Sequence, residues 1–150
     1  MKTNTKQLCN TFLCILAVFL TAGIFTGCGE SDSQKLEAYN QNVEEARNAL
    51  NRSEYMRAHD LVREGAENGH VKSQALLGVA YMKLGQHADG YFWIRRAAEA
   101  GDPMSQINLA LCYTDGKGVK QNSLEASHWK NEAVKNGYTG PVGILYMFVY

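Results

Sequence analysis

The chain has 150 residues, of which 45% are apolar and 20% are charged, with fifteen basic residues balanced by fifteen acidic ones. This length fits one domain. A formal net charge of zero provides no broad field that would attract nucleic acid or an anionic membrane surface. The presence of only two prolines and a normal apolar content argue against a disordered chain. The function must therefore be sought in the sequence pattern of a folded domain.

The first segment of the chain has the pattern of an export signal. Lys2 and Lys6 precede an apolar run over residues 12–25. That run is shorter than the ~20 residues that cross a bilayer, but it has the length of a signal-peptide core. We therefore interpret residues 1–27 as a signal peptide that is removed from the folded protein.

Small residues then lead to a cysteine in the sequence Phe25-Thr26-Gly27-Cys28, which resembles the lipobox of bacterial lipoproteins. The resemblance implies cleavage before Cys28 and lipidation of this residue with fatty acyl chains such as palmitate. Gly29 lacks the aspartate that retains lipoproteins in the inner membrane, so the resemblance implies a bacterial envelope protein anchored in the outer membrane and facing the periplasm. An uncleaved signal anchor is the alternative.

This interpretation divides the rest of the chain. Residues 28–33 form a lipidated tether, and residues 34–150 form the folded domain. Cys112 is then the one cysteine of that domain. A single thiol cannot form a disulfide within the chain, and unpaired cysteines are among the residues most often buried. We expect Cys112 to be buried and inert.

The folded domain contains a repeated pattern. At a spacing of 32 residues, four pairs of like residues recur, namely Gly69/Gly101, Ser73/Ser105, Leu77/Leu109 and Tyr81/Tyr113. Later pairs have a spacing of 36 residues, namely Trp93/Trp129, Ala97/Ala133 and Gly101/Gly137. Four extra residues within segment 115–119 account for the longer spacing. Because insertions belong in loops, this segment is predicted to be a loop.

Each unit of the repeat predicts two helices. Ser73, Leu77 and Tyr81 lie at positions i, i+4 and i+8, which places them on one stripe of a helix. The next helix contains Trp93 and ends at Gly101, where a left-handed cap is needed. No segment shows sustained alternation with β-branched enrichment. The sequence therefore predicts an all-α fold, in which glycines and alanines recur where helices approach closely.

The repeat resembles the Sel-one-like repeats, a subclass of the tetratricopeptide-like helical repeats. The residues that carry the resemblance in the fuller unit are Ser105, Leu109, Tyr113, Gly116, Gly118-Val119, Ala126, Trp129, Ala133 and Gly137. The other unit departs from the pattern in its shorter loop and in having Gly90 where this unit has Ala126. The resemblance implies a right-handed α-solenoid of antiparallel helix pairs. The best repeats span about 70–101 and 102–137, a partial unit spans 138–150, and a degenerate pair precedes them.

Residues that could carry a reaction do not cluster in the sequence. No Gly-x-Ser-x-Gly motif is present, and the four histidines lack the spacing of zinc ligands. Cys112 and His128 are expected on different helices, which argues against a catalytic pair. We therefore expect no catalytic residue, no metal site and no cofactor. A cell-wall hydrolase is the rival hypothesis, because proteins with similar repeats have been proposed to act so.

The remaining function is protein binding. Stacked helix pairs expose a concave surface that such proteins use for recognition, and the chain closes with the apolar run 144–150. We predict a partner-binding surface made of Val79, Met82, Ile107, Leu111, Met147 and Tyr150. The alternatives are packing of the apolar stripe against neighbouring repeats, a homodimer through the C-terminal run, or a truncated reading frame.

The family resemblance also implies a role. Small lipoproteins of this kind act as immunity proteins, which neutralise secreted antibacterial effectors such as type VI phospholipases in the periplasm. The alternative is an envelope scaffold or assembly adaptor with no inhibitory role. Under both hypotheses the partner is another protein, the lipid anchor holds the chain at the membrane, and no nucleic acid is bound.

Overall fold

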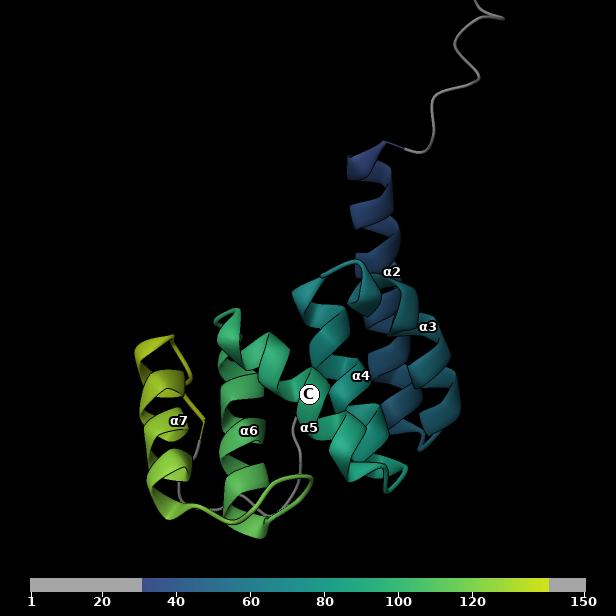
Figure 1. Ribbon diagram of the computed structural model, residues 1–150. Helices are drawn as coiled ribbons and strands as arrows, with labels where there is room; N and C mark the ends of the chain where they lie inside the picture. The colour runs from purple at the N-terminus through teal and green to yellow at the C-terminus, as the bar shows by residue number, and fades with distance from the viewer. Residues whose placement is uncertain (1–30, 141–150) are drawn as a thin grey trace, which may run out of the picture. The chain divides into compact units, whose positions relative to one another are not determined.

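The computed structural model describes residues 31–140 (Figure 1). Its six helices are α2 (Asp32–Asn51), α3 (Tyr55–Glu67), α4 (Val71–Lys83), α5 (His87–Glu99), α6 (Pro103–Asp115) and α7 (Ser123–Lys135). No strand occurs between residues 31 and 140, so the prediction of an all-α fold is confirmed there. The predicted signal peptide, Cys28, Met147 and Tyr150 lie outside the described residues.

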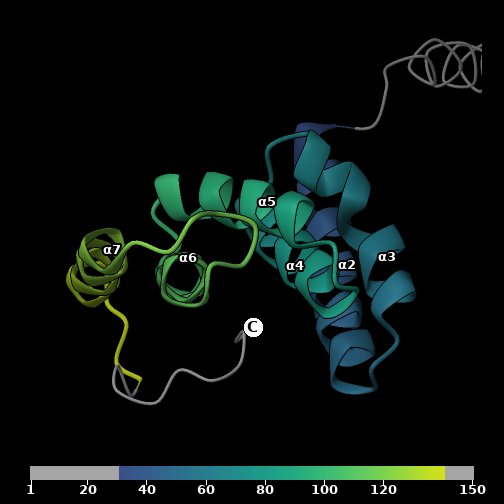
Figure 2. The same cartoon turned by 60° about the horizontal axis from the view of Figure 1, so that its bottom comes forward.

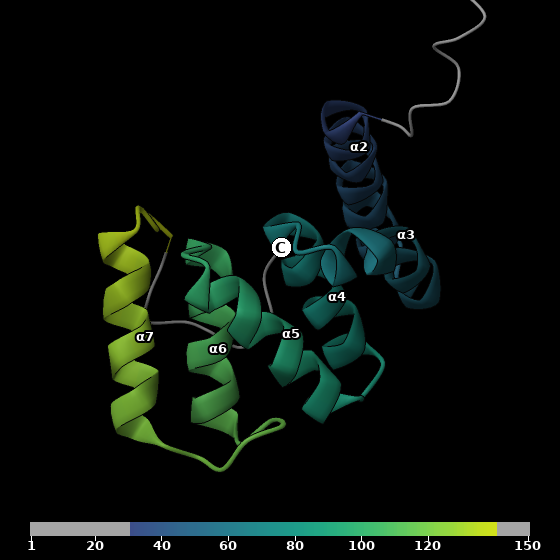
Figure 3. The ribbon, with the colours of Figure 1, turned by 45° about the horizontal axis from the view of Figure 1, so that its top comes forward.

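The described residues 36–140 belong to one unit of the chain, and residues 31–35 belong to another. Within residues 36–140, the helices pack in consecutive pairs, with α4 against α5 and α6 against α7. The second helix of each pair also packs against the first helix of the next, as α3 does on α4 and α5 on α6. Figure 2 shows α5 next to both α4 and α6, and Figure 3 shows α6 beside α7.

Helices α3, α5 and α7 end in the same way. Each is followed by a glycine in the left-handed region, with φ of 86° at Gly69, 92° at Gly101 and 94° at Gly137. The amide after the glycine then bonds back into the helix, as Asp102 N does to Ala97 O at 3.1 Å. This arrangement is a Schellman cap, which needs a residue without a Cβ penalty at positive φ. The predicted helix end at Gly101 is confirmed.

The repeat of the sequence is also a repeat of contacts. The buried Gln74 Nε2 donates to Ala66 O at 3.1 Å, and Gln106 Nε2 donates to Ala98 O at 3.1 Å. Both residues of the second bond follow those of the first by 32 positions. In each case a side chain from the first helix of a pair satisfies a carbonyl near the end of the helix before it. A buried amide that finds the same partner twice shows that the two units share one packing geometry.

A second contact recurs at the same spacing. His59 Nε2 lies 3.1 Å from Tyr81 Oη, and Tyr91 Oη lies 3.0 Å from Tyr113 Oη. Both ring pairs meet edge to face, with centroids 5.1 Å and 6.0 Å apart. These tyrosines therefore join each first helix to the second helix of the preceding pair, through the preferred aromatic geometry.

Glycines let α4 and α5 approach closely, as the sequence predicts for small residues. A Cβ placed on Gly78 would lie 2.6 Å from Ile94 Cγ1, and one placed on Gly90 would lie 3.0 Å from Gly78 O. Ile94 itself is fully buried. Any larger residue at Gly78 or Gly90 must therefore push the two helices apart.

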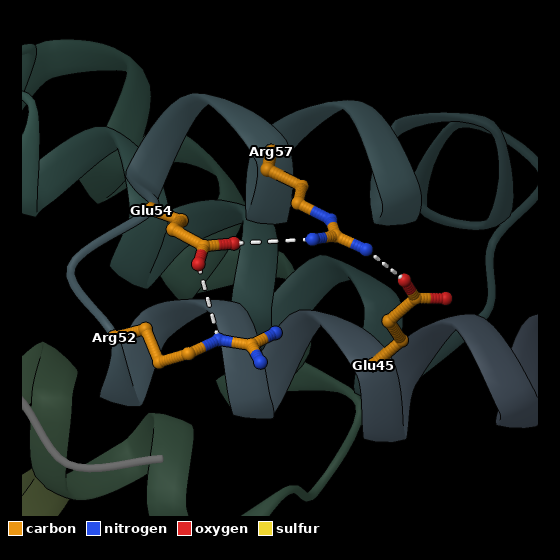
Figure 4. A network of polar contacts seen from close by, with 4 residues as sticks. All are labelled: Glu45, Arg52, Glu54 and Arg57. Carbon is orange, nitrogen blue, oxygen red and sulfur yellow. Dashed lines mark hydrogen bonds and ion pairs between the residues drawn. The ribbon is translucent and has the colours of Figure 1, made fainter.

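The joint between α2 and α3 carries a network of charged side chains (Figure 4). Arg57 donates to both Glu54 and Glu45, and Arg52 Nε lies 3.1 Å from Glu54 Oε1. These contacts span the tight turn at Ser53, whose φ is 61°. Because the side chains are largely exposed, the network orients the two helices more than it stabilises the fold.

Candidate functional site

A cavity of about 170 Å³ lies between α2, α4 and α6, the first helices of three successive pairs. Its lining residues are Arg47 from α2, Lys72, Ala75, Leu76 and Val79 from α4, and Asp102, Met104, Ser105 and Asn108 from the start of α6. The packing of each helix pair on the next places these three helices around one space. Other hollows occur on the helix pairs, including one of about 430 Å³ beside Trp129 and the loop before α7.

The wall of the cavity is apolar on one part and basic on another. Ala75, Leu76, Val79 and Met104 supply the apolar part, and Arg47 and Lys72 supply two positive charges. Asp102 is the one acidic residue of the lining, and its carboxylate is already engaged at the start of α6, where it accepts from Ser105 N at 2.7 Å. Among the lining residues the cations therefore outnumber the carboxylates, although Glu44 lies 3.9 Å from Arg47 Nε.

Two polar atoms of this lining are buried and have no hydrogen-bond partner among residues 31–140, namely Arg47 Nε and Ser105 Oγ. Arg47 Nε lies 3.9 Å from Glu44 Oε2, which is beyond hydrogen-bond distance. Leaving a buried donor unsatisfied costs about 1–3 kcal/mol. Such atoms in a folded protein call for an explanation, and a bound ligand is one.

The reason for the free hydroxyl is visible by comparison with the preceding unit. There, the equivalent Ser73 Oγ lies 2.8 Å from His70 Nδ1. The residue that corresponds to His70 is Asp102, 32 positions later, and its side chain caps the backbone instead. Ser105 is fully buried, and its hydroxyl has lost the partner that Ser73 keeps.

Four of the predicted partner-binding residues lie in the described part of the chain, and all four are buried. Val79 lines the cavity, although only 1% of it is exposed. Met82 packs inside the α4–α5 pair, where its Cγ would lie 2.8 Å from a Cβ on Gly90. Ile107 and Leu111 are 0% and 2% exposed. The stripe expected to be exposed is thus buried along these two helices, and the role of its residues in binding stays a prediction.

Sequence reasoning missed the polar side of the cavity. Arg47 belongs to the degenerate first pair, where the repeat gives no register, and Lys72 has the appearance of an ordinary solvated residue. The sequence pattern places Ser105 only on the packed stripe. One signal could have identified it, since a comparison of the two units shows Asp102 where the other has His70.

Two further titratable groups have pKa values shifted in the direction that favours the neutral form. Burial, together with the charge of Lys72, lowers the pKa of His70. Burial raises the pKa of the Cys112 thiol to about 12, and this cysteine is 0% exposed. The prediction that Cys112 is buried is confirmed, and its high pKa disfavours the reactive thiolate.

Within residues 31–140, no group of His, Cys, Asp and Glu side chains is arranged to hold a metal ion. None of the helices α2 to α7 has the length and apolar content that a bilayer span requires.

No family model matches the chain. Several curated proteins resemble part of it, among them the three that follow. The DAP3-binding cell death enhancer 1 of Rattus norvegicus is 40% identical over 77 residues, which cover 49% of this chain and 15% of that protein. Its counterpart from Mus musculus is 34% identical over 93 residues, which cover 59% and 18%. An F-box protein of Arabidopsis thaliana is 35% identical over 82 residues, which cover 55% and 23%. The chain therefore matches less than a quarter of the length of each relative.

These relatives correct the predicted location. All three are eukaryotic proteins, so the prediction of a lipid-anchored bacterial protein in the outer membrane, facing the periplasm, is wrong. The prediction that Cys28 is lipidated concerns a residue outside the described range 31–140 and is not tested there. The physical reason for the wrong location is that a short apolar run followed by small residues and a cysteine is a brief motif, with no structural context of its own to confirm it.

Proposed function

We propose that residues 36–140 form a protein-binding module, built of Sel-one-like helix pairs that stack as a right-handed solenoid. The module binds a partner protein at the cavity between α2, α4 and α6 and performs no chemistry of its own. One observation carries the proposal. A cavity formed by three successive first helices combines an apolar wall with the cations Arg47 and Lys72, and two of its buried polar atoms, Arg47 Nε and Ser105 Oγ, have no hydrogen-bond partner among the described residues.

The relatives support a protein as the partner. Two of them are named for binding DAP3, and the third is an F-box protein. In each, the matching segment is a small part of a much longer chain, which is a cell death enhancer in two cases and an F-box protein in the third. A segment that recurs in this way suits an interaction module, which an adaptor uses to join one protein to another.

The other candidate roles receive less support. An immunity role against a secreted bacterial effector required a periplasmic location, which the relatives contradict. Homodimerisation through the C-terminal apolar run concerns residues outside the described range. We therefore retain the adaptor hypothesis, in which the partner is neither a secreted bacterial effector nor a second copy of this chain.

Site-specific photo-crosslinking tests the proposal. A photoreactive residue is placed at Met104, which lines the cavity, or at Leu124, which is 81% exposed on α7 and lies outside the cavity lining. In the native host, position 104 should yield a discrete crosslinked protein that position 124 does not yield. Equal crosslinking from both positions, or a product from position 124 alone, would refute the assignment of the binding surface.

A further inference from the structure

We infer that the cavity between α2, α4 and α6 receives the side chain of a glutamate from the partner, with Arg47, Lys72 and Ser105 as the donors to its carboxylate. This inference rests on the proposed function and names the chemical group that the binding surface recognises.

Two of the donor atoms have no hydrogen-bond partner in the described part of the protein, although the Arg47 side chain forms an ion pair with Glu44 at 3.9 Å. Ser105 Oγ and Arg47 Nε are buried without a hydrogen-bond partner among the described residues. Lys72 forms no ion pair within residues 31–140. A carboxylate accepts hydrogen bonds through both oxygens and prefers charged donors, so it matches this set better than a neutral acceptor does.

The two acidic side chains nearest the cavity do not accept hydrogen bonds from Ser105 Oγ or Arg47 Nε. Asp102 already accepts from Ser105 N at 2.7 Å, and Glu44 lies 3.9 Å from Arg47 Nε without a hydrogen bond to it. The starts of α4 and α6 also border the cavity, because Lys72 and Met104 are second residues of their helices. Helix N-termini carry partial positive charge, which adds to that of the two cations.

Size and polarity favour glutamate over a bare anion. The volume of about 170 Å³ is close to that of a protein cavity of about 150 Å³ that binds benzene. A glutamate side chain is close to benzene in size, and its methylenes would contact the apolar wall formed by Ala75, Val79 and Met104. Phosphate has no apolar part and would leave this wall without contacts.

An NMR titration of the full chain tests the inference with three probes: N-acetyl-glutamate N-methylamide, its glutamine counterpart and inorganic phosphate. We expect the glutamate compound to shift the backbone amides of Lys72, Ala75 and Met104 in a saturable way, with a Kd of roughly 1–10 mM. The glutamine compound should bind at least about tenfold more weakly, because it loses the charge-assisted hydrogen bonds.

Variants locate the effect. Arg47→Gln and Lys72→Gln should each weaken binding of the glutamate compound about tenfold, whereas Arg63→Gln, a control on the exposed face of α3, should not. Ser105→Ala should weaken binding without lowering the midpoint of unfolding, because it removes a hydroxyl that the free protein leaves unsatisfied.

Any of three results would overturn the inference: equal affinity for the glutamate and glutamine compounds, tighter binding of phosphate, or equal losses of affinity in the Arg47 and Arg63 variants. If position 104 still crosslinks a partner while the glutamate compound does not bind, the proposed function stands and this inference falls. If position 104 crosslinks nothing, the proposed function itself falls.

Discussion

The loop between α6 and α7 should not tolerate a side chain at Gly118. Its φ is 74°, and a Cβ at this position would overlap His87 O and lie 2.7 Å from Tyr91 Cβ. The loop thus folds back onto the backbone of α5. We expect Gly118→Ala to destabilise the domain through both the backbone angle and the contact with α5.

The two contributions can be separated with a matched control. Gly85 has a φ of 79°, but a Cβ there would meet nothing within 4 Å. An L-residue in the left-handed region costs about 1–2 kcal/mol, so Gly85→Ala should lose about that much. Overpacking adds about 1–3 kcal/mol, so Gly118→Ala should lose about 2–5 kcal/mol.

Urea unfolding of the full chain, followed by far-ultraviolet circular dichroism, measures both losses. The free energy of unfolding should fall further for Gly118→Ala than for Gly85→Ala, with unchanged slopes. Equal losses would show that the loop does not press on α5 and would refute the packing of the loop on this helix.

Three further predictions concern one half-buried and two buried groups. The pKa of His70 is lowered from 6.5, so below that pH the unfolded chain holds more protons than the folded chain. The free energy of unfolding should therefore fall as the pH falls from about 6.5 through the folded pKa. His70→Gln should reduce this pH dependence, which unfolding measured at several pH values can detect. Cys112 should react with a thiol reagent at neutral pH only after unfolding, when the other three cysteines are replaced by serine. Gln106→Met should lower the free energy of unfolding by about 1–3 kcal/mol, because it removes the bond that the buried Gln106 amide donates to Ala98 O and the bond it accepts from Asn136 Nδ2.

The helices could be predicted from the sequence because their signals are local. Stripes at helical spacing and a glycine at each repeat end depend on neighbouring residues, and the Schellman cap at Gly101 follows from that pattern. The repeat register was also readable, since Gln74 and Gln106 make the same bond in successive units.

The cavity could not be predicted because it depends on tertiary geometry. The sequence predicts Met82 as a partner-binding residue, but its side chain instead fills the space left by the missing Cβ of Gly90. Arg47 reaches the cavity from a helix that the repeat pattern does not align. Burial of Ser105 is consistent with the packed stripe, whereas the loss of its hydrogen-bond partner depends on how the side chains meet in three dimensions.

The central claim is that the surface between α2, α4 and α6 binds a protein. Isothermal titration calorimetry tests it most directly, with the purified partner that photo-crosslinking identifies. The affinity is measured for Lys72→Glu and for the equal charge reversal Arg63→Glu on α3. We predict at least about a tenfold loss of affinity for Lys72→Glu, because it puts a negative charge at a site built for an anion, and no loss for Arg63→Glu. Equal affinities for the two variants would contradict the account.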